Sequence, residues 1–88
     1  MVYRIVYKKS VHRDLKKLEK NEASNVLDQI ENDLSNHPSS FPVLKGKFSG
    51  LRKYRVGDYR VIYVIMEEDV IILRIGDRKE VYKKIAKL

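Results

Sequence analysis

The alternation of apolar and polar residues is clearest in the middle of the chain, on both sides of Gly57-Asp58. Residues 52–56 and 59–63 are two runs rich in β-branched and aromatic residues. A Gly-Asp pair between such runs supplies the positive φ angle that a tight turn requires. The pattern therefore predicts a β-hairpin.

A two-residue turn sets the register of this hairpin. Arg55 then pairs with Arg60 and Lys53 with Ile62, so that Lys53, Arg55 and Arg60 share one face. Like charges directly opposite each other in a ladder repel, so folding alone gives little reason for this pair. An anionic ligand would give a reason, and the alternative is a solvated basic face.

Three further apolar stretches have the length of strands or strand extensions. Residues 59–66 and 70–75 are strongly apolar and are separated by an acidic turn at 67–69, and Gly76 is expected to end the last strand. Residues 2–7 form a β-rich run that can join the hairpin. Because both faces of these strands are largely apolar, the sheet should be covered on both sides, partly by a partner chain.

Helical periodicity follows the first strand. Ser10 is the expected N-cap of a short amphipathic helix that ends near Asn21. Its apolar positions are Val11, Leu15 and Leu18, and its polar positions are Arg13, Asp14, Lys16, Lys17 and Glu19. A second helix has the apolar stripe Ala23, Val26, Leu27, Ile30 and Leu34 and an acidic opposite side. The short connection predicts an antiparallel helical hairpin packed on the sheet.

The expected fold is therefore a single α+β domain over residues 1–88. Its order is an N-terminal strand, an antiparallel helical hairpin and then antiparallel strands (βααβββ), with a short C-terminal helical segment. The apolar face of that last segment is formed by Val81, Ile85 and Leu88.

Charge is distributed unevenly along the 88 residues. The net charge is +7, and residues 1–44 contain 7 basic and 6 acidic residues whereas residues 45–88 contain 12 and 6. The excess lies in the half that contains the hairpin, which points to one surface that faces a polyanion, with nucleic acid as the leading partner. No apolar run is long enough to cross a membrane, and no secretory signal is recognisable, so the cytoplasm is the expected location.

The residues suited to chemistry are cations and a tyrosine. Arg78 and Tyr82 are four residues apart, so a helical turn would place them on one face. There is no cysteine, and neither His12 nor His37 lies near a motif for metal binding, so no metal or other cofactor is expected. A cationic cluster can stabilise charge on a phosphodiester without a metal. On RNA, this permits attack by the adjacent 2′-hydroxyl on phosphorus.

Three motifs give the chain a family resemblance that extends over almost its whole length. They are Leu44-Lys45-Gly46, Tyr54-Arg55-Val56-Gly57-Asp58-Tyr59-Arg60-Val61-Ile62-Tyr63 and Ile75-Gly76-Asp77-Arg78-Lys79-Glu80-Val81-Tyr82. With this order of elements, the chain resembles the RelE/ParE superfamily of toxin–antitoxin toxins, and within it the RelE-type messenger RNA interferases. Asp77 departs from the histidine that many relatives carry.

The resemblance implies a ribosome-dependent endoribonuclease that cuts messenger RNA in the A site. Its implied catalytic residues are Lys53, Arg55, Arg60, Arg78 and Tyr82. The expected RNA-binding residues are Lys45, Lys47, Arg52 and Lys79. An acidic, RelB-like antitoxin is the expected partner, in a toxin–antitoxin hetero-oligomer.

Two other functions remain open from the sequence. A ParE-type toxin would inhibit DNA gyrase by binding and would not be a nuclease. A noncatalytic RNA-binding or ribosome-binding module would use the same cations only to hold phosphates. New RNA ends would distinguish the nuclease from both alternatives.

Overall fold

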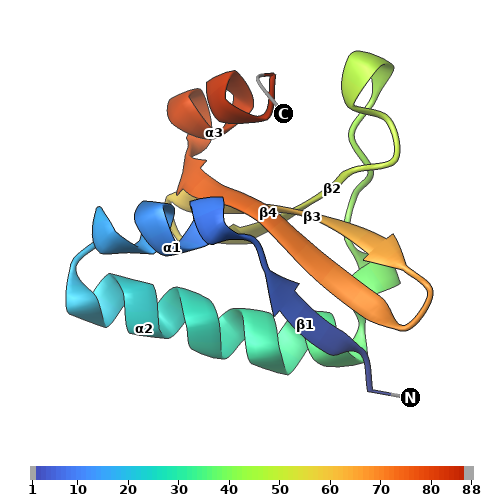
Figure 1. The fold of residues 1–88 in the computed structure, drawn as a ribbon, viewed down its shortest axis with the longest axis horizontal. Coiled ribbons are helices and arrows are strands. Elements are labelled where there is room, and N and C mark those ends of the chain that lie inside the picture. Colours follow the sequence, from blue (N-terminus) through green and yellow to red (C-terminus); the bar gives the residue numbers. More distant parts are fainter. Residues whose placement is uncertain (1, 87–88) are drawn as a thin grey trace.

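The computed structural model describes residues 2–86, which form a four-stranded sheet with helices on both faces (Figure 1). The strands are β1 (Arg4–Tyr7), β2 (Arg52–Val56), β3 (Tyr59–Met66) and β4 (Asp69–Asp77). The helices are α1 (Lys9–Lys16), α2 (Lys20–Gln29), which continues as a π-helical turn at Ile30–Leu34, and α3 (Arg78–Ile85). Short 3-10 turns lie at Pro38–Ser40 and Gly46–Phe48. The predicted α+β fold class is confirmed.

Strands β2 and β3 form the predicted hairpin in the predicted register. Arg55 is opposite Arg60, and Lys53 is opposite Ile62. Gly57 has a φ of 58°, whereas the φ of Asp58 is negative, and a glycine with positive φ at the first turn position is the pattern of a type II′ turn. The turn geometry therefore sets which side chains share a face.

The N-terminal strand lies elsewhere in the sheet than expected. The strand order is β1-β4-β3-β2, and β1 pairs with β4 in parallel instead of joining the hairpin directly. Arg4 is opposite Asp69, and its Nε lies 2.9 Å from the Asp69 carboxylate. Asp69 is thus a strand residue that pairs β4 with β1, and its assignment to the turn was wrong.

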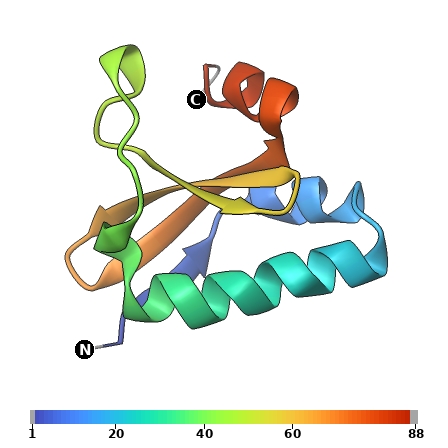
Figure 2. The same cartoon turned by 180° about the vertical axis from the view of Figure 1, so that it is seen from behind.

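Two apolar clusters lie on opposite faces of the sheet, because side chains alternate along β3 and β4. Helices α1 and α2 cover one face, while α3 and the segment 44–51 lie on the other (Figures 1 and 2). The second cluster contains Ile62, Leu73, Val81 and Ile85, all buried. Within residues 2–86, the chain itself supplies the cover that was expected partly from a partner.

The boundaries of α1 differ from the prediction. Its N-cap is Lys8, which makes no side-chain capping bond, and Ser10 lies inside the first turn. The Ser10 hydroxyl instead donates a hydrogen bond of 2.9 Å to the Leu73 carbonyl on β4. The helix ends at Lys16 instead of near Asn21. Ser10 therefore attaches α1 to the sheet and does not cap it.

The C-terminal helix forms where the apolar spacing predicts it. Val81 and Ile85 are buried against the sheet, whereas Leu88 lies outside the described residues. Strand β4 passes through Gly76 and ends one residue later, at Asp77, so Gly76 does not end it. No helix within residues 2–86 is both long enough and apolar enough to span a membrane.

Candidate functional site

The hairpin presents three of the predicted cations on the sheet face that carries α3. Arg55 and Arg60 are directly opposite each other, and Lys53 lies on the same face. The Arg55 Nε donates a hydrogen bond of 2.8 Å to the Gly57 carbonyl, which orients its guanidinium at the turn. In β4, the residue opposite Arg60 is Gly76, which has no side chain that could fill the space next to Arg60.

The start of α3 adds two more cations beside the hairpin. Asp77 is the N-cap of α3, and its Oδ1 accepts a hydrogen bond of 2.8 Å from the Glu80 amide. This cap begins the helix directly after β4 and places Arg78 and Lys79 in its first turn. Because Asp77 pairs with Tyr59, this turn lies next to the hairpin turn.

These elements enclose a surface hollow of about 370 Å³, which we call the cationic hollow. Its lining residues are Arg55, Asp58, Arg60, Asp77, Arg78 and Lys79. Four cations face two carboxylates, and one of those carboxylates accepts the capping hydrogen bond. Within residues 2–86, neither Arg60 nor Arg78 forms an ion pair. The hollow therefore carries an excess positive charge that favours an anionic ligand.

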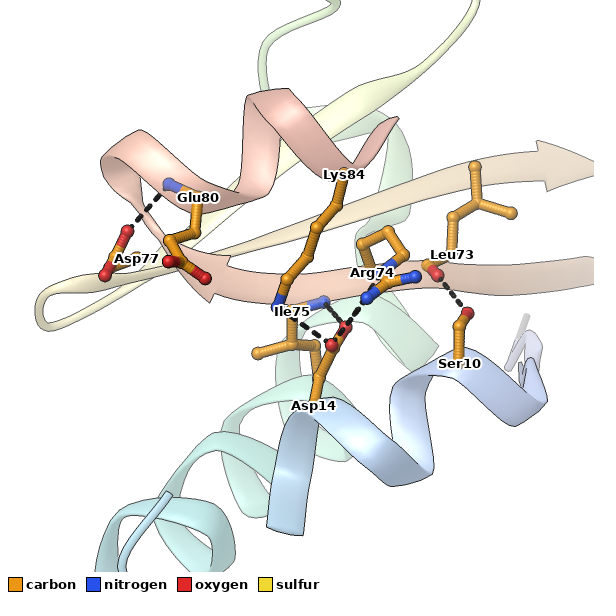
Figure 3. A network of polar contacts seen from close by, with 8 residues as sticks. All are labelled: Ser10, Asp14, Leu73, Arg74, Ile75, Asp77, Glu80 and Lys84. Atoms are coloured by element: carbon orange, nitrogen blue, oxygen red, sulfur yellow. Dashed lines mark hydrogen bonds and ion pairs between the residues drawn. The ribbon is translucent and has the colours of Figure 1, made fainter. Parts of the chain in front are cut away.

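A second charged cluster, the Asp14 cluster, lies between the helices, and one carboxylate pairs with both of its cations (Figure 3). Asp14 Oδ2 accepts from Arg74 Nε at 3.1 Å and from the Ile75 amide at 2.9 Å. Its Oδ1 accepts from Arg74 Nη2 at 2.8 Å and from Lys84 Nζ at 2.9 Å. The Asp14 side chain is 1% exposed. One carboxylate thus connects α1, β4 and α3.

The prediction that Asp14 lies on the polar side of α1 is wrong, because Asp14 is buried. It is three residues after Val11 and four before Leu18, so helical spacing puts it on the apolar face. This spacing could have identified Asp14 as a buried residue, although the sequence gives no partner for its carboxylate. Through Lys84, Asp14 holds in place the helix that carries Arg78.

The remaining candidates are distributed around the hollow and do not line it. Tyr82 is half-buried and packs against the second apolar cluster. Lys45 and Lys47 are exposed at the 3-10 turn, where Lys47 lies over the neighbouring phenylalanine ring. The Arg52 Nη1 donates a hydrogen bond of 2.8 Å to the Phe41 carbonyl, so its guanidinium holds a loop. Only Arg55, Arg60, Arg78 and Lys79 of the predicted residues meet in the cationic hollow.

Two tyrosines of the hairpin, Tyr54 and Tyr63, have a structural role. Tyr54 is buried and donates a hydrogen bond to the Asp33 carboxylate. Burial is the larger cause of the raised pKa of Tyr54, and this hydrogen bond adds to it. Burial raises the pKa of Tyr63 to about 12, and its hydroxyl donates to the Pro38 carbonyl. Both side chains are therefore uncharged at neutral pH and cannot act there as bases.

Metal-ligating side chains are scattered in the described part of the chain. Both histidines, His12 and His37, are exposed. Within residues 2–86, no three His, Cys, Asp or Glu side chains come together in a way that could hold a metal ion. The chemistry that these residues offer is that of the guanidinium and ammonium groups in the cationic hollow.

Comparison with known proteins assigns this fold to the toxins of type II toxin–antitoxin systems. The family described as "ParE toxin of type II toxin-antitoxin system, parDE" matches residues 5–82. The chain belongs to this family, which lies in the RelE/ParE superfamily, so the resemblance seen in its motifs is confirmed. A search of the curated proteins found no match.

Solved structures of toxin–antitoxin proteins share the fold. The RelBE2 toxin–antitoxin complex from Mycobacterium tuberculosis is similar with 30% identity and a TM-score of 0.83, over 89% of this chain and 100% of that one. An archaeal RelE–RelB complex from Pyrococcus horikoshii OT3 has 30% identity and a TM-score of 0.65, over 89% and 97%. The chromosomal ParDE system from P. aeruginosa, with 11% identity and a TM-score of 0.70 over 86% and 96%, shows the fold alone.

Proposed function

We propose that this toxin is a ribosome-dependent endoribonuclease that cuts messenger RNA in the A site. The observation that carries the proposal is the cationic hollow, in which Arg55, Arg60, Arg78 and Lys79 converge. A phosphodiester matches such a site, because arginine presents a planar fork of donors to phosphate oxygens. A toxin that only bound another protein would not need these cations in one hollow.

The reaction that fits these groups is transesterification within the RNA, without a metal ion. The 2′-oxygen forms a bond to phosphorus and loses its proton, while the bond from phosphorus to the 5′-oxygen breaks and that oxygen gains a proton. The products are a 2′,3′-cyclic phosphate, or its hydrolysis product, and a 5′-hydroxyl. Negative charge builds up on the phosphoryl oxygens during this step, and fixed cations stabilise it most where water is excluded.

Each predicted catalytic residue has a role in this proposal. Arg60 and Arg78 stabilise the charge on the phosphoryl oxygens or assist the leaving oxygen. Lys53 or Arg55 helps to remove the proton of the 2′-hydroxyl. Tyr82 positions the nucleotide, although it lies outside the lining of the hollow, so its contact would be with the RNA beyond the scissile phosphate.

The outer cations extend the proposed RNA contact beyond the hollow. Lys45 and Lys47 are exposed on one side, and Lys79 lies in the wall of the hollow itself. Arg52 contributes less directly, because its guanidinium is already engaged with backbone carbonyls. We assign these residues to phosphate contacts, which give affinity without sequence preference.

The proposed partner is an acidic antitoxin of the RelB type, which holds the toxin inactive in a hetero-oligomer. Two similar solved structures, at 30% identity each, are complexes of RelE-type toxins with their RelB antitoxins. The net charge of +7 favours an acidic partner by electrostatic complementarity. Action on ribosomes places the toxin in the cytoplasm.

Programmed ribosomes test the proposal directly. The purified chain is incubated with them, and new messenger ends are mapped by primer extension. We expect cuts in the A site, and we expect Arg60→Ala and Arg78→Ala each to lower the cleavage rate by about a hundredfold or more. The matched control is Arg13→Ala, which removes an exposed arginine from α1, and it should cleave within about threefold of wild type.

Uncut messenger with the folded wild-type chain would overturn the nuclease proposal. Equal cleavage by wild type, Arg60→Ala and Arg78→Ala at equal stability would instead overturn the assignment of the catalytic site to these arginines. Inhibition of DNA gyrase is the second candidate, favoured by the ParE description of the matching family. A supercoiling assay on the same preparations distinguishes it, because a gyrase inhibitor would block supercoiling and leave messenger intact.

A further inference from the structure

A second hollow adjoins the cationic hollow and shares two of its arginines. It has a volume of about 320 Å³, and Phe41, Pro42, Lys53, Tyr54, Arg55 and Arg60 line it. Arg55 and Arg60 line both hollows. The wall contributed by residues 41–42 is apolar, and binding of a phosphate alone makes no use of it. We call this space the aromatic hollow.

The apolar wall is held rigidly beside β2. The Phe41 carbonyl accepts the hydrogen bond from Arg52, and the Lys53 amide donates a hydrogen bond of 3.1 Å to the Pro42 carbonyl. The Phe41 ring meets the Tyr54 ring edge to face, with centroids 4.7 Å apart and an angle of 64° between their planes. Phe41 is nevertheless only partly buried, and Pro42 is exposed. The wall is therefore preorganised and open to a ligand.

We propose that the aromatic hollow is a nucleobase subsite, in which Phe41 and Pro42 contact the base of a nucleotide whose phosphate lies between Arg55 and Arg60. A nucleotide joins a flat apolar ring to an anion, which matches an aromatic wall next to a pair of arginines. The base must be unstacked to enter, so the ligand is single-stranded RNA. The choice of RNA as ligand rests on the proposed function.

The subsite should contact the flat face of a base by stacking and should not recognise the edges of the base by hydrogen bonds. The Tyr54 hydroxyl already donates a hydrogen bond to the Asp33 carboxylate. Phe41 and Pro42 offer no side-chain donor or acceptor. Stacking on such a surface tolerates any base, and preferences follow from the strength of stacking. We therefore expect the affinity for purines to be a few-fold higher than the affinity for pyrimidines.

The test measures binding and does not depend on cleavage. The probe is a fluorescein-labelled RNA hexamer whose 2′-oxygens are methylated, so that it cannot be cut. Fluorescence anisotropy at low salt compares wild type with Phe41→Leu, which keeps an apolar side chain on the core but removes the aromatic face. We expect Phe41→Leu to weaken binding by about 5- to 10-fold, because stacking on an aromatic side chain is lost, and Phe41→Trp to restore it.

Two controls make the result specific. Hexamers with a single abasic position identify the seated base, and wild type and Phe41→Leu should bind the hexamer that lacks it equally well. Phe48→Leu changes a half-buried aromatic residue outside the aromatic hollow and should bind within about twofold of wild type. Circular dichroism and thermal unfolding verify that each variant is folded.

The inference fails if wild type does not bind the hexamer, if Phe41→Leu binds it as well as wild type, or if the loss is the same for every abasic hexamer. Its failure is distinct from that of the proposed function. A base-dependent effect of Phe41 with uncut messenger would support the subsite and reject the nuclease. Cuts in the A site without an effect of Phe41 would do the opposite.

Discussion

The protein contains two clusters of cations, which differ in whether the cations are paired with a carboxylate of the chain. In one, Arg74 and Lys84 both contact the buried Asp14 carboxylate, and their side chains are 20% and 16% exposed. In the other, Arg55 and Arg60 are directly opposite each other across the hairpin and line an open hollow. The cations of the first cluster form ion pairs within the chain, whereas Arg55 and Arg60 form no ion pair within residues 2–86.

This difference separates charges that serve the fold from charges available to a ligand. A buried carboxylate without partners would be costly, so the Asp14 cluster is complete within the chain. The Arg55–Arg60 pair repels and gains nothing from folding alone. A ligand with negative charge would relieve this repulsion, which is the physical basis for the proposal that an RNA phosphate binds there.

The largest expected effect comes from removing the carboxylate of the Asp14 cluster. Asp14→Asn should lower the free energy of unfolding by about 3 kcal/mol, because two cations next to the core lose their counter-charge. Urea unfolding followed by circular dichroism measures it. Asp28→Asn, at an exposed position of α2, is the control and should change stability by less than about 0.5 kcal/mol. A loss for Asp14→Asn no larger than that of the control would show that the cluster is not needed for stability.

A smaller effect is expected at the rim of the cationic hollow. Asp77→Ala removes the N-cap of α3 and should cost about 1 kcal/mol of stability. Asp77→Asn keeps a capping oxygen and should stay within about 0.5 kcal/mol of wild type. Both variants remove a negative charge from the hollow, so both should bind the methylated RNA hexamer about threefold more tightly at low salt. Weaker binding by Asp77→Asn would contradict the electrostatic description of the site.

The smallest expected effect is a change in the free energy of unfolding that has opposite signs in the two clusters. Arg60→Gln removes a like-charge contact and should raise the free energy of unfolding by about 0.5 kcal/mol at low salt. High salt should remove this gain by screening. Arg74→Gln removes a cation of the same kind from the Asp14 cluster, where it pairs with the buried carboxylate, and should instead destabilise the fold. A destabilisation by Arg60→Gln equal to that of Arg74→Gln would mean that both arginines serve the fold.

Local patterns in the sequence determined much of this protein. The two-residue turn at Gly57-Asp58 sets the hairpin register, so the common face of Lys53, Arg55 and Arg60 follows from residues within one short stretch of chain. Helical spacing likewise predicted α2 and the burial of Val81 and Ile85. These features depend on residues close together in the chain, whose geometry follows from backbone periodicity.

Tertiary structure alone decided which distant segments meet. Strand β1 pairs with β4, Asp14 pairs with Arg74 and Lys84, and Phe41 lies beside β2, and each contact joins residues well separated in sequence. No local pattern encodes such partners, because they depend on how the sheet and helices pack. The sequence by itself therefore determined the cationic face, and packing decided that α3 completes the cationic hollow and that an aromatic wall adjoins it.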